Sequence, residues 1–191
     1  MKDIEVEIQV EAENIQPLIE LMEKSGKFLF EEHQIDQYYT PLHRDFRNKK
    51  PIEEWLRLRN SDGKYSVTYK NWHRDKNKKA VHCDEYETTL GDIDQLEKIL
   101  KILNFTTVVK VDKSRKAYMY KEYEIALDKV KNLGNFIEIE YKSKKIKDPS
   151  LIAQEMISFL KSLKLGKISK NSVGYAYKLL YPEDDHLEEE L

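Results

Sequence analysis

Several short segments of this sequence alternate charged and apolar residues with a period of two. Three of them carry paired glutamates, at Ile4–Ile8, Asp84–Glu87 and Phe136–Tyr141. Two others carry arginine or lysine in the same pattern, at Trp55–Arg59 and Asp112–Arg115. Residues two apart in a β-strand point to the same side of the sheet. The alternation therefore predicts strands that have one strongly charged face and one apolar face.

Three segments depart from this period and place apolar residues at helical spacing. The first is expected over residues 14–26, with Asn14 as its N-cap, and the second begins at Asp92. The third opens with Asp148 and Pro149, an N-cap followed by a proline at the first helical position, and ends before Gly166. Three amphipathic helices would cover the apolar side of a sheet and let its charged side face inward.

The rest of the chain is richer in strand signals than in helix signals. The clearest is a β-hairpin, with alternating runs at 53–60 and 64–71 and turn residues between them. Residues 41–51 are basic and aromatic and are expected to form a loop, and a last short strand is expected near 173–180. Many strands with few helices and no βαβ rhythm predict the α+β class, with an antiparallel sheet or barrel.

Composition narrows the class of protein. With 191 residues, the chain is expected to form one domain over 1–181, followed by an acidic, flexible tail at 182–191. The 33 basic residues nearly balance the 35 acidic ones, which argues against a nucleic-acid binder. Cys83 is the only cysteine, so an intrachain disulfide is excluded. The sequence shows neither a signal-peptide pattern nor an apolar run of membrane-spanning length, and a soluble, cytoplasmic protein is expected.

The charged strands suggest a chemistry. Paired carboxylates suit hard divalent cations, and the planar guanidinium of arginine binds phosphate oxygens in a bidentate manner. Each pair taken alone fits an ordinary solvent-exposed strand face. Three pairs of glutamates together would repel one another unless cations lie between them. The glycines are scattered singly, so a glycine-rich phosphate loop is absent and side chains would have to hold any phosphate.

The order of these motifs is specific. Glu5, Glu7 and Gln9 form a pattern similar to the E-x-E-x-K signature of the CYTH superfamily, the triphosphate tunnel group. That group includes class IV adenylyl cyclases, thiamine triphosphatases and inorganic triphosphatases. The resemblance continues to about residue 180, through segments 36–39, 55–59, 67–70, 85–87, 113–118 and 127–140.

The resemblance implies a closed eight-stranded antiparallel β-barrel, or tunnel, with amphipathic helices packed outside. It also implies an enzyme that uses Mg²⁺ or Mn²⁺ to act on a triphosphate. The metal ligands it implies are Glu5, Glu7, Asp128, Glu138 and Glu140. The residues it assigns to the substrate phosphates are Arg57, Arg59, Lys70, Glu85, Glu87, Lys113 and Arg115. The residues it places at the reaction centre are Glu5, Glu7, Gln9 and Tyr38, with a buried structural phenol as the alternative for Tyr38.

Several alternatives stay open at this point. The slightly favoured hypothesis is hydrolysis of tripolyphosphate, ATP or thiamine triphosphate. The second hypothesis is conversion of ATP to cyclic AMP and pyrophosphate. A non-catalytic polyphosphate or nucleotide binder is the third, because Gln9 replaces the signature lysine and a neutral amide cannot neutralise phosphate charge. An ordinary α+β interaction domain with solvent-exposed charged strands is the least favoured.

Other features receive no firm role. The 41–51 segment would either lie over a tunnel mouth or remain a solvated loop, and homodimer formation is left open. His33, His43, His73 and His82 show no metal-ligand spacing and are assigned to no site.

Overall fold

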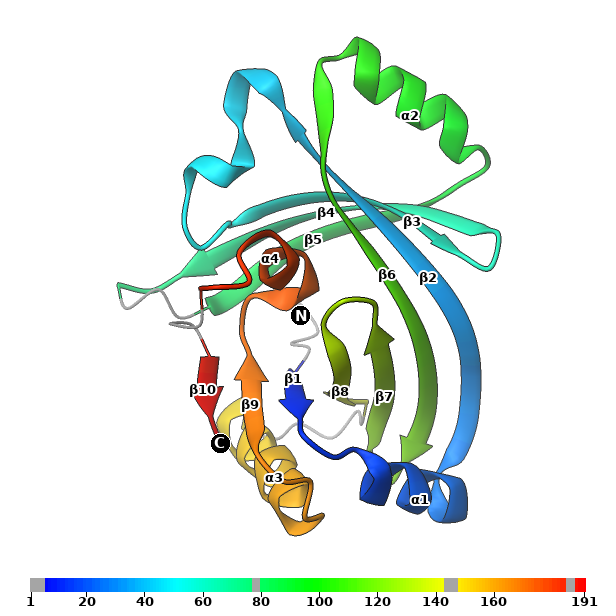
Figure 1. Ribbon diagram of the computed structural model, residues 1–191, viewed down its shortest axis with the longest axis vertical. Coiled ribbons are helices and arrows are strands. Elements are labelled where there is room, and N and C mark those ends of the chain that lie inside the picture. Colours follow the sequence, from blue (N-terminus) through cyan, green and yellow to red (C-terminus); the bar gives the residue numbers. More distant parts are fainter. Residues whose placement is uncertain (1–5, 77–79, 143–147, 185–187) are drawn as a thin grey trace. The chain divides into compact units, whose positions relative to one another are not determined.

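The structure is a computed structural model, and it describes residues 6–76, 80–142, 148–184 and 188–191 (Figure 1). The described strands form one large antiparallel sheet, in the order β10-β9-β1-β8-β7-β6-β2-β3-β4-β5. The strands are β1 (Glu7–Ala12), β2 (Lys27–Pro41), β3 (Glu54–Ser61), β4 (Lys64–Arg74), β5 (Ala80–Leu90), β6 (Phe105–Tyr120), β7 (Tyr123–Val130), β8 (Gly134–Tyr141), β9 (Ile168–Asn171) and β10 (Glu188–Glu190). The helices are α1 (Gln16–Ser25), α2 (Ile93–Ile102), α3 (Pro149–Ser162) and α4 (Gly174–Leu180), with 3₁₀ turns η1 (Leu42–Arg44) and η2 (Phe46–Asn48).

The predicted α+β class is confirmed, whereas the closed eight-stranded barrel is not. Ten strands are described instead of eight. Their hydrogen bonds do not close the sheet, because β5 and β10 each have a neighbour on one side only. Among the described residues no helix is long and apolar enough to cross a membrane.

The chain divides into two compact units. Unit 1 comprises residues 1–32, 114–172 and 185–191, and unit 2 comprises residues 33–113 and 173–184. Strands β2 and β6 each contribute residues to both units. The predicted site residues are divided between the units, so each unit is described separately.

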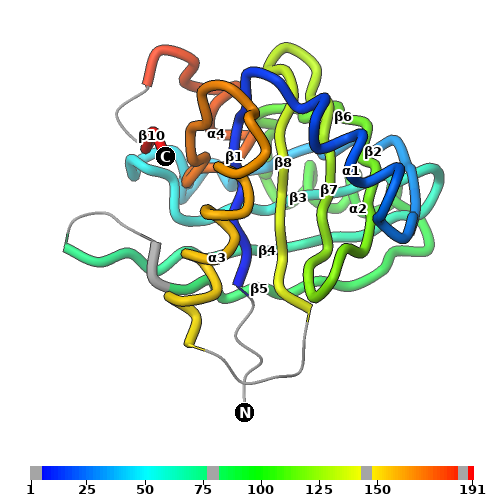
Figure 2. The backbone as a smooth tube through the Cα atoms, turned by 90° about the horizontal axis from the view of Figure 1, so that it is seen from below, coloured from blue at the N-terminus to red at the C-terminus, as the bar shows by residue number. Residues whose placement is uncertain are grey.

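Unit 1 is built around the apolar face of β1, β8 and β7. Ile8 and Val10 of β1 point into a core that also contains Ile137 and Ile139 of β8, and all four side chains are buried. Helices α1 and α3 lie along this face (Figure 2) and bury Leu18, Met22, Ile152, Met156 and Leu160 against it. The strict alternation of β1 and β8 therefore leaves their polar residues on the opposite face.

Unit 2 contains the predicted hairpin, formed by β3 and β4. Its turn residues Asp62 and Gly63 both have positive φ, 48° and 83°. Two central residues with positive φ are typical of the tight turns whose twist matches that of the flanking strands. On the apolar face, Leu58 packs with Tyr39 of β2 and Leu100 of α2. Helix α2 therefore covers the face opposite the charged one.

The starts of α2 and α3 follow the predicted capping residues. Asp92 accepts a hydrogen bond from the Gln95 backbone N–H at the start of α2, and Asp148 accepts one from Ser150 at the start of α3. The N-cap of α1 is Ile15 and not the predicted Asn14, which lies one residue earlier and accepts a hydrogen bond at its Oδ1 from the Gln16 backbone N–H at 3.0 Å.

The strand predicted near 173–180 is wrong, because these residues form helix α4. Gly174 has a φ of +80°, which breaks the extended backbone after β9. Tyr175, Ala176 and Tyr177 are then buried in succession, which a strand with one covered face does not allow. Strand β6 runs without interruption over Phe105–Tyr120, and the 41–51 loop contains η1 and η2.

Candidate functional site

A set of charged residues in unit 2 lies on one face of β2, β3, β4 and β5, here termed the cationic face. Its register places Asp36 opposite Arg59 and Tyr38 opposite Arg57. Directly opposite residues of antiparallel strands point to the same side of the sheet. The register of the next strands adds further members, and the cationic face consists of Asp36, Tyr38, Arg57, Arg59, Thr68, Lys70, Glu85, Glu87 and the nearby Lys113 of β6.

Asp36 is the buried anchor of this face. Arg59 donates two hydrogen bonds to its carboxylate, Nε to Oδ1 and Nη2 to Oδ2, each 2.7 Å long. Arg57 Nη1 lies 3.6 Å from Oδ2. Burial alone would raise the pKa of Asp36, but the Arg59 hydrogen bond and the charges of Arg57, Arg59 and Lys113 outweigh it and hold the pKa below its usual value. Asp36 is therefore ionised and fixes both guanidinium groups.

Two exposed glutamates are further partners of the cations on this face. Arg57 Nη2 donates to Thr68 Oγ1 at 2.9 Å and to Glu87 Oε2 at 3.3 Å. Lys70 Nζ lies 2.9 Å from Glu85 Oε2. The side chains of Glu87 and Glu85 are 49% and 37% exposed, against 3% for Asp36. These two glutamates are the partners that an incoming anion can displace at lowest cost, since exposed ion pairs contribute little.

Lys113 and Tyr38 complete the face. Lys113 is buried, and its Nζ lies 5.0 Å from the ring centroid of Tyr175 in α4, within the range of a cation–π contact. Tyr38 packs edge-on against Trp55, with ring centroids 5.3 Å apart. Burial, together with the charge of Asp36, raises the pKa of Tyr38. Tyr38 is therefore a neutral hydrogen-bond donor at neutral pH and is unsuited to act as a base.

A set of charged residues in unit 1 lies on the polar face of β1, β8 and β7 together with Arg115 of β6, here termed the carboxylate face. Its centre is a chain of hydrogen bonds through Glu138. Arg115 donates to both oxygens of Asp128 at 2.7 Å and to Glu138 Oε2 at 2.9 Å. Gln9 Nε2 donates to the same Glu138 oxygen at 3.0 Å, and Asn171 Nδ2 donates to Gln9 Oε1 at 2.6 Å. Burial alone would lower the pKa of Arg115, but Glu138 and Asp128 raise it well above its ordinary value.

Gln9 therefore has a defined position. Its amide nitrogen donates to Glu138 of β8, and its amide oxygen accepts from Asn171 of β9. The glutamine that stands in place of the signature lysine therefore links β8 to β9. A lysine at this position has no acceptor for the Asn171 amide.

A row of glutamates crosses the same face. Glu7 stands opposite Glu140, and Glu140 stands opposite Glu124 of β7. Lys142 forms an ion pair with Glu140 at 2.5 Å. Three carboxylates in adjacent strands repel one another unless cations lie among them. Their oxygen donors fit a hard divalent cation such as Mg²⁺ or Mn²⁺.

The structure thus gathers the predicted site residues into two sets. Glu5 lies outside the described residues. Glu7, Gln9, Glu138, Glu140, Asp128 and Arg115 share the carboxylate face of unit 1, and the remaining predicted residues share the cationic face of unit 2.

Sequence reasoning missed four contributors. Asn171 takes part through its hydrogen bond to Gln9, which no spacing reveals, and Thr68 was noted only as part of the 67–70 motif. Asp36 was noted only as part of a motif, although it anchors the cationic face. Glu124 was detectable, because it stands four residues before Asp128 and so on the same face of the predicted strand.

Comparisons with known proteins show the family of this chain. A family model for the CYTH domain matches residues 1–175. A protein of Methanocaldococcus jannaschii named "Putative adenylate cyclase" is 34% identical over 165 residues, which are 86% of this chain and 91% of that protein.

Solved structures show the same fold. A Pyrococcus horikoshii protein superposes with a TM-score of 0.73 at 29% identity, covering 94% of this chain and all of that one. A Hippeastrum protein, described as an adenylyl cyclase candidate with a dominant triphosphatase activity, superposes with a TM-score of 0.68 at 16% identity, covering 94% of this chain and 96% of that one.

Proposed function

The chain belongs to the CYTH domain family, and on this premise we propose that it binds a triphosphate and hydrolyses it with the help of Mg²⁺ or Mn²⁺. The observation that carries the proposal is the cationic face. This face carries four cations, Arg57, Arg59, Lys70 and Lys113. A buried aspartate holds the two arginines in place, and an anion can displace the two exposed glutamates.

Each cation has a role that its contacts support. Arg57 and Lys70 exchange Glu87 and Glu85 for phosphate oxygens, because an anion with several charges competes well with one exposed carboxylate. Arg59 stays hydrogen-bonded to Asp36, which holds the Arg59 guanidinium in its orientation. Lys113 adds charge from a buried position. Together they neutralise the phosphoryl oxygens on which charge develops during reaction.

The carboxylate face fits the metal. Glu7, Glu138 and Glu140 would hold it, with Glu124 as an additional ligand and Glu5 as the member outside the described residues. The chemistry that such an ion would supply is that of a Lewis acid in phosphoryl transfer. Asp128 is bound in a bidentate manner by Arg115, so its contribution would be to position Arg115 and, through it, Glu138.

The proposed reaction requires little beyond these groups. Water attacks the terminal phosphorus and loses a proton to the solvent, the bond to the bridging oxygen breaks, and orthophosphate and the shorter polyphosphate are released. Tyr38, which stays protonated, donates a hydrogen bond to substrate or to the departing oxygen.

Adenylyl cyclase activity is the second candidate, and the name of the Methanocaldococcus jannaschii relative favours it. In that reaction the ribose 3′-hydroxyl attacks the α-phosphorus of ATP and pyrophosphate leaves. The same cations and metal would serve, but the site would also have to orient a ribose and a base. The triphosphatase activity described for the Hippeastrum protein belongs to a chain that resembles this one in fold alone.

One panel tests the proposal. The purified chain is incubated with tripolyphosphate, ATP and thiamine triphosphate, each with Mg²⁺, with Mn²⁺ or with EDTA, and the products are identified by ³¹P NMR. Metal-dependent orthophosphate supports hydrolysis, and cyclic AMP with pyrophosphate supports the cyclase. A Glu138→Gln variant should lose turnover by at least about a hundredfold, because it lacks a ligand and a partner of Arg115. Binding without turnover would contradict both enzymatic readings and leave a non-catalytic binder.

A further inference from the structure

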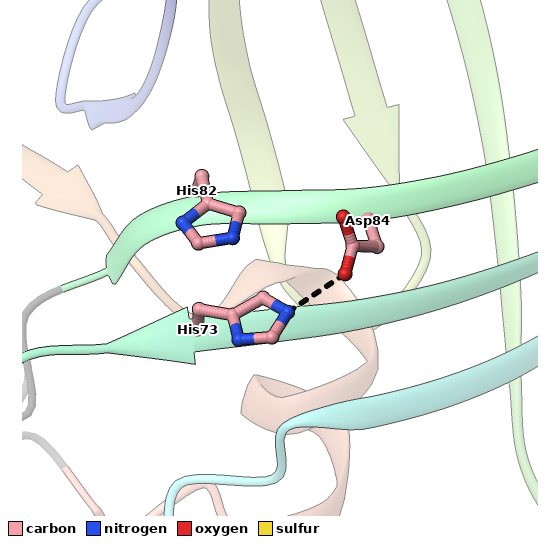
Figure 3. Close-up of side chains that lie close together, drawn as sticks. All are labelled: His73, His82 and Asp84. Carbon is pink, nitrogen blue, oxygen red and sulfur yellow. Dashed lines mark hydrogen bonds and ion pairs between the residues drawn. The ribbon is translucent and has the colours of Figure 1, made fainter.

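A second group of potential metal ligands lies near the end of the β4–β5 pair, within unit 2. His73 of β4 stands directly opposite His82 of β5, and their rings stack with centroids 4.2 Å apart and an interplanar angle of 9°. Asp84 lies two residues beyond His82, and its Oδ2 is 2.8 Å from His73 Nε2 (Figure 3). One imidazole nitrogen of each histidine and one carboxylate oxygen of Asp84 all lie within 4.8 Å of one another.

This group is separate from the cationic face. Lys70 stands opposite Glu85 in the register. On β4, His73 lies three residues from Lys70, and on β5, Asp84 lies one residue from Glu85. Side chains at odd spacing point to opposite sides of a strand. The histidine cluster therefore lies on the other face of β4 and β5, and an ion bound there would not contact the proposed phosphate ligands.

We propose that His73, His82 and Asp84 bind one divalent d-block cation, with Zn²⁺ as the representative ion. Two imidazoles and one carboxylate form a donor set that such ions prefer, whereas Mg²⁺ prefers oxygen ligands alone. A hydrogen bond joins His73 Nε2 and Asp84 Oδ2, so one proton lies between these two side chains. The cation takes the place of that proton, so the two side chains already lie at a separation that one ion can bridge.

Only a small rearrangement is needed. Two parallel stacked rings cannot both direct a nitrogen in its ring plane at one ion, so one ring has to turn. His82 is the ring that turns, because its side chain is exposed and its terminal torsion is broad. Three protein ligands then hold the ion, and water or a group from another molecule completes the shell.

The chain offers a matched control. His33 also contacts a carboxylate, with Nε2 2.6 Å from Asp112 Oδ1, but among the described groups no second imidazole joins it. One histidine with one aspartate should bind Zn²⁺ far more weakly than two histidines with one aspartate. A His33→Ala variant therefore removes a similar His–Asp pair without touching the proposed site.

The test is a Zn²⁺ titration of the full chain by isothermal calorimetry, in millimolar Mg²⁺ so that carboxylate sites are already occupied. We expect one Zn²⁺ per chain for the wild type. His73→Ala and His82→Ala should each weaken this binding by at least about tenfold, Asp84→Asn should weaken it less, and His33→Ala should leave it unchanged.

A second measurement keeps the inference testable if a variant folds poorly. In the wild-type chain, imidazole NMR signals assigned to His73 and His82 should shift on Zn²⁺ addition and saturate at one equivalent, while those of His33 stay in place. No Zn²⁺ binding by the wild type would overturn the inference. Equal binding by the two well-folded alanine variants, or a shift of His33 alone, would overturn it as well.

Discussion

At the scale of single residues, burial separates the charged side chains that fix the site from those that can exchange partners. Asp36 is nearly inaccessible and is bound by Arg59, whereas Glu85 and Glu87 are exposed. Removing one partner of a buried ion pair leaves an uncompensated charge, which costs far more than losing an exposed pair. Substitutions at these two kinds of carboxylate should therefore behave differently.

Asp36→Asn should lower the free energy of unfolding by about 3–5 kcal/mol near pH 6, because Arg57 and Arg59 lose the charge that holds them together. Asp36 has a lower pKa folded than unfolded, so its contribution is complete above the usual aspartate value of 3.8 and is lost as the pH falls through the folded pKa. In urea unfolding, the free energy of unfolding should fall less between pH 6 and pH 3 for the variant than for the wild type.

The control is Asp94→Asn, an exposed carboxylate in the first turn of α2, which should change stability by no more than about 0.5 kcal/mol. Equal stability of Asp36→Asn and the wild type at pH 6 would show that Asp36 does not anchor the cationic face.

Gln9→Ala should lower the free energy of unfolding by about 1–3 kcal/mol, because Glu138 and Asn171 each lose a partner in a part-buried network. Chemical denaturation measures the change. Gln16→Ala removes an exposed amide from α1 whose bond to Glu20 is on the surface, and it should have little effect. If Gln9→Ala lowered the free energy of unfolding no more than Gln16→Ala, the hydrogen bonds of Gln9 would not contribute to stability.

The residue types of the site could be predicted, but several of their roles could not. Alternation placed Arg57 and Arg59 on one face and Glu138 and Glu140 on another, because the strand period alone decides that. The pairing of Asp128 with Arg115 required the register of β7 and β8 and the position of β6, which no local pattern contains. The proximity of His73 and His82 could not be predicted either, because they meet only across the β4–β5 pair.

At the scale of elements, periodicity predicted best where one face of a segment is covered. The β3–β4 hairpin and the capped starts of α2 and α3 formed as expected. Helix α4 did not, because a short run of tyrosines fits a strand and a buried helix equally well. The closed barrel rested on family resemblance, and the hydrogen-bond order of the sheet does not confirm it.

Leu160→Ala in α3 should lower the free energy of unfolding by about 2–5 kcal/mol, because this fully buried side chain fills the core between α3 and the sheet of unit 1. Leu151→Ala in the same helix is the matched control, since that side chain is 55% exposed. Denaturant unfolding of both variants makes the comparison. Similar destabilisation by the two substitutions would contradict the packing of α3 described above.

At the scale of the whole molecule, a nearly neutral chain carries two strongly charged faces. The formal net charge is −2, yet cations gather on the polar face of unit 2 and carboxylates on that of unit 1. Total charge therefore says little about what this protein binds, whereas its distribution favours an anion and a cation as ligands.

Because these interactions are electrostatic and partly exposed, the affinity for tripolyphosphate should fall with added salt. Raising KCl from 50 to 500 mM should weaken binding on the order of tenfold as the Debye length shortens. Calorimetric titrations at several salt concentrations measure this dependence. An affinity that does not change with salt would argue that the cationic face is not where the anion binds.

The most direct test of the central proposal is the dissociation constant of tripolyphosphate for the wild type, Lys70→Ala and Lys98→Ala, measured by calorimetry under identical conditions. Lys70 belongs to the cationic face, whereas Lys98 is an exposed lysine on α2, which packs on the opposite face of the sheet. The proposal predicts binding by the wild type, at least about tenfold weaker binding by Lys70→Ala, and no change for Lys98→Ala. Equal affinity of all three proteins, or no binding by the wild type, would contradict it.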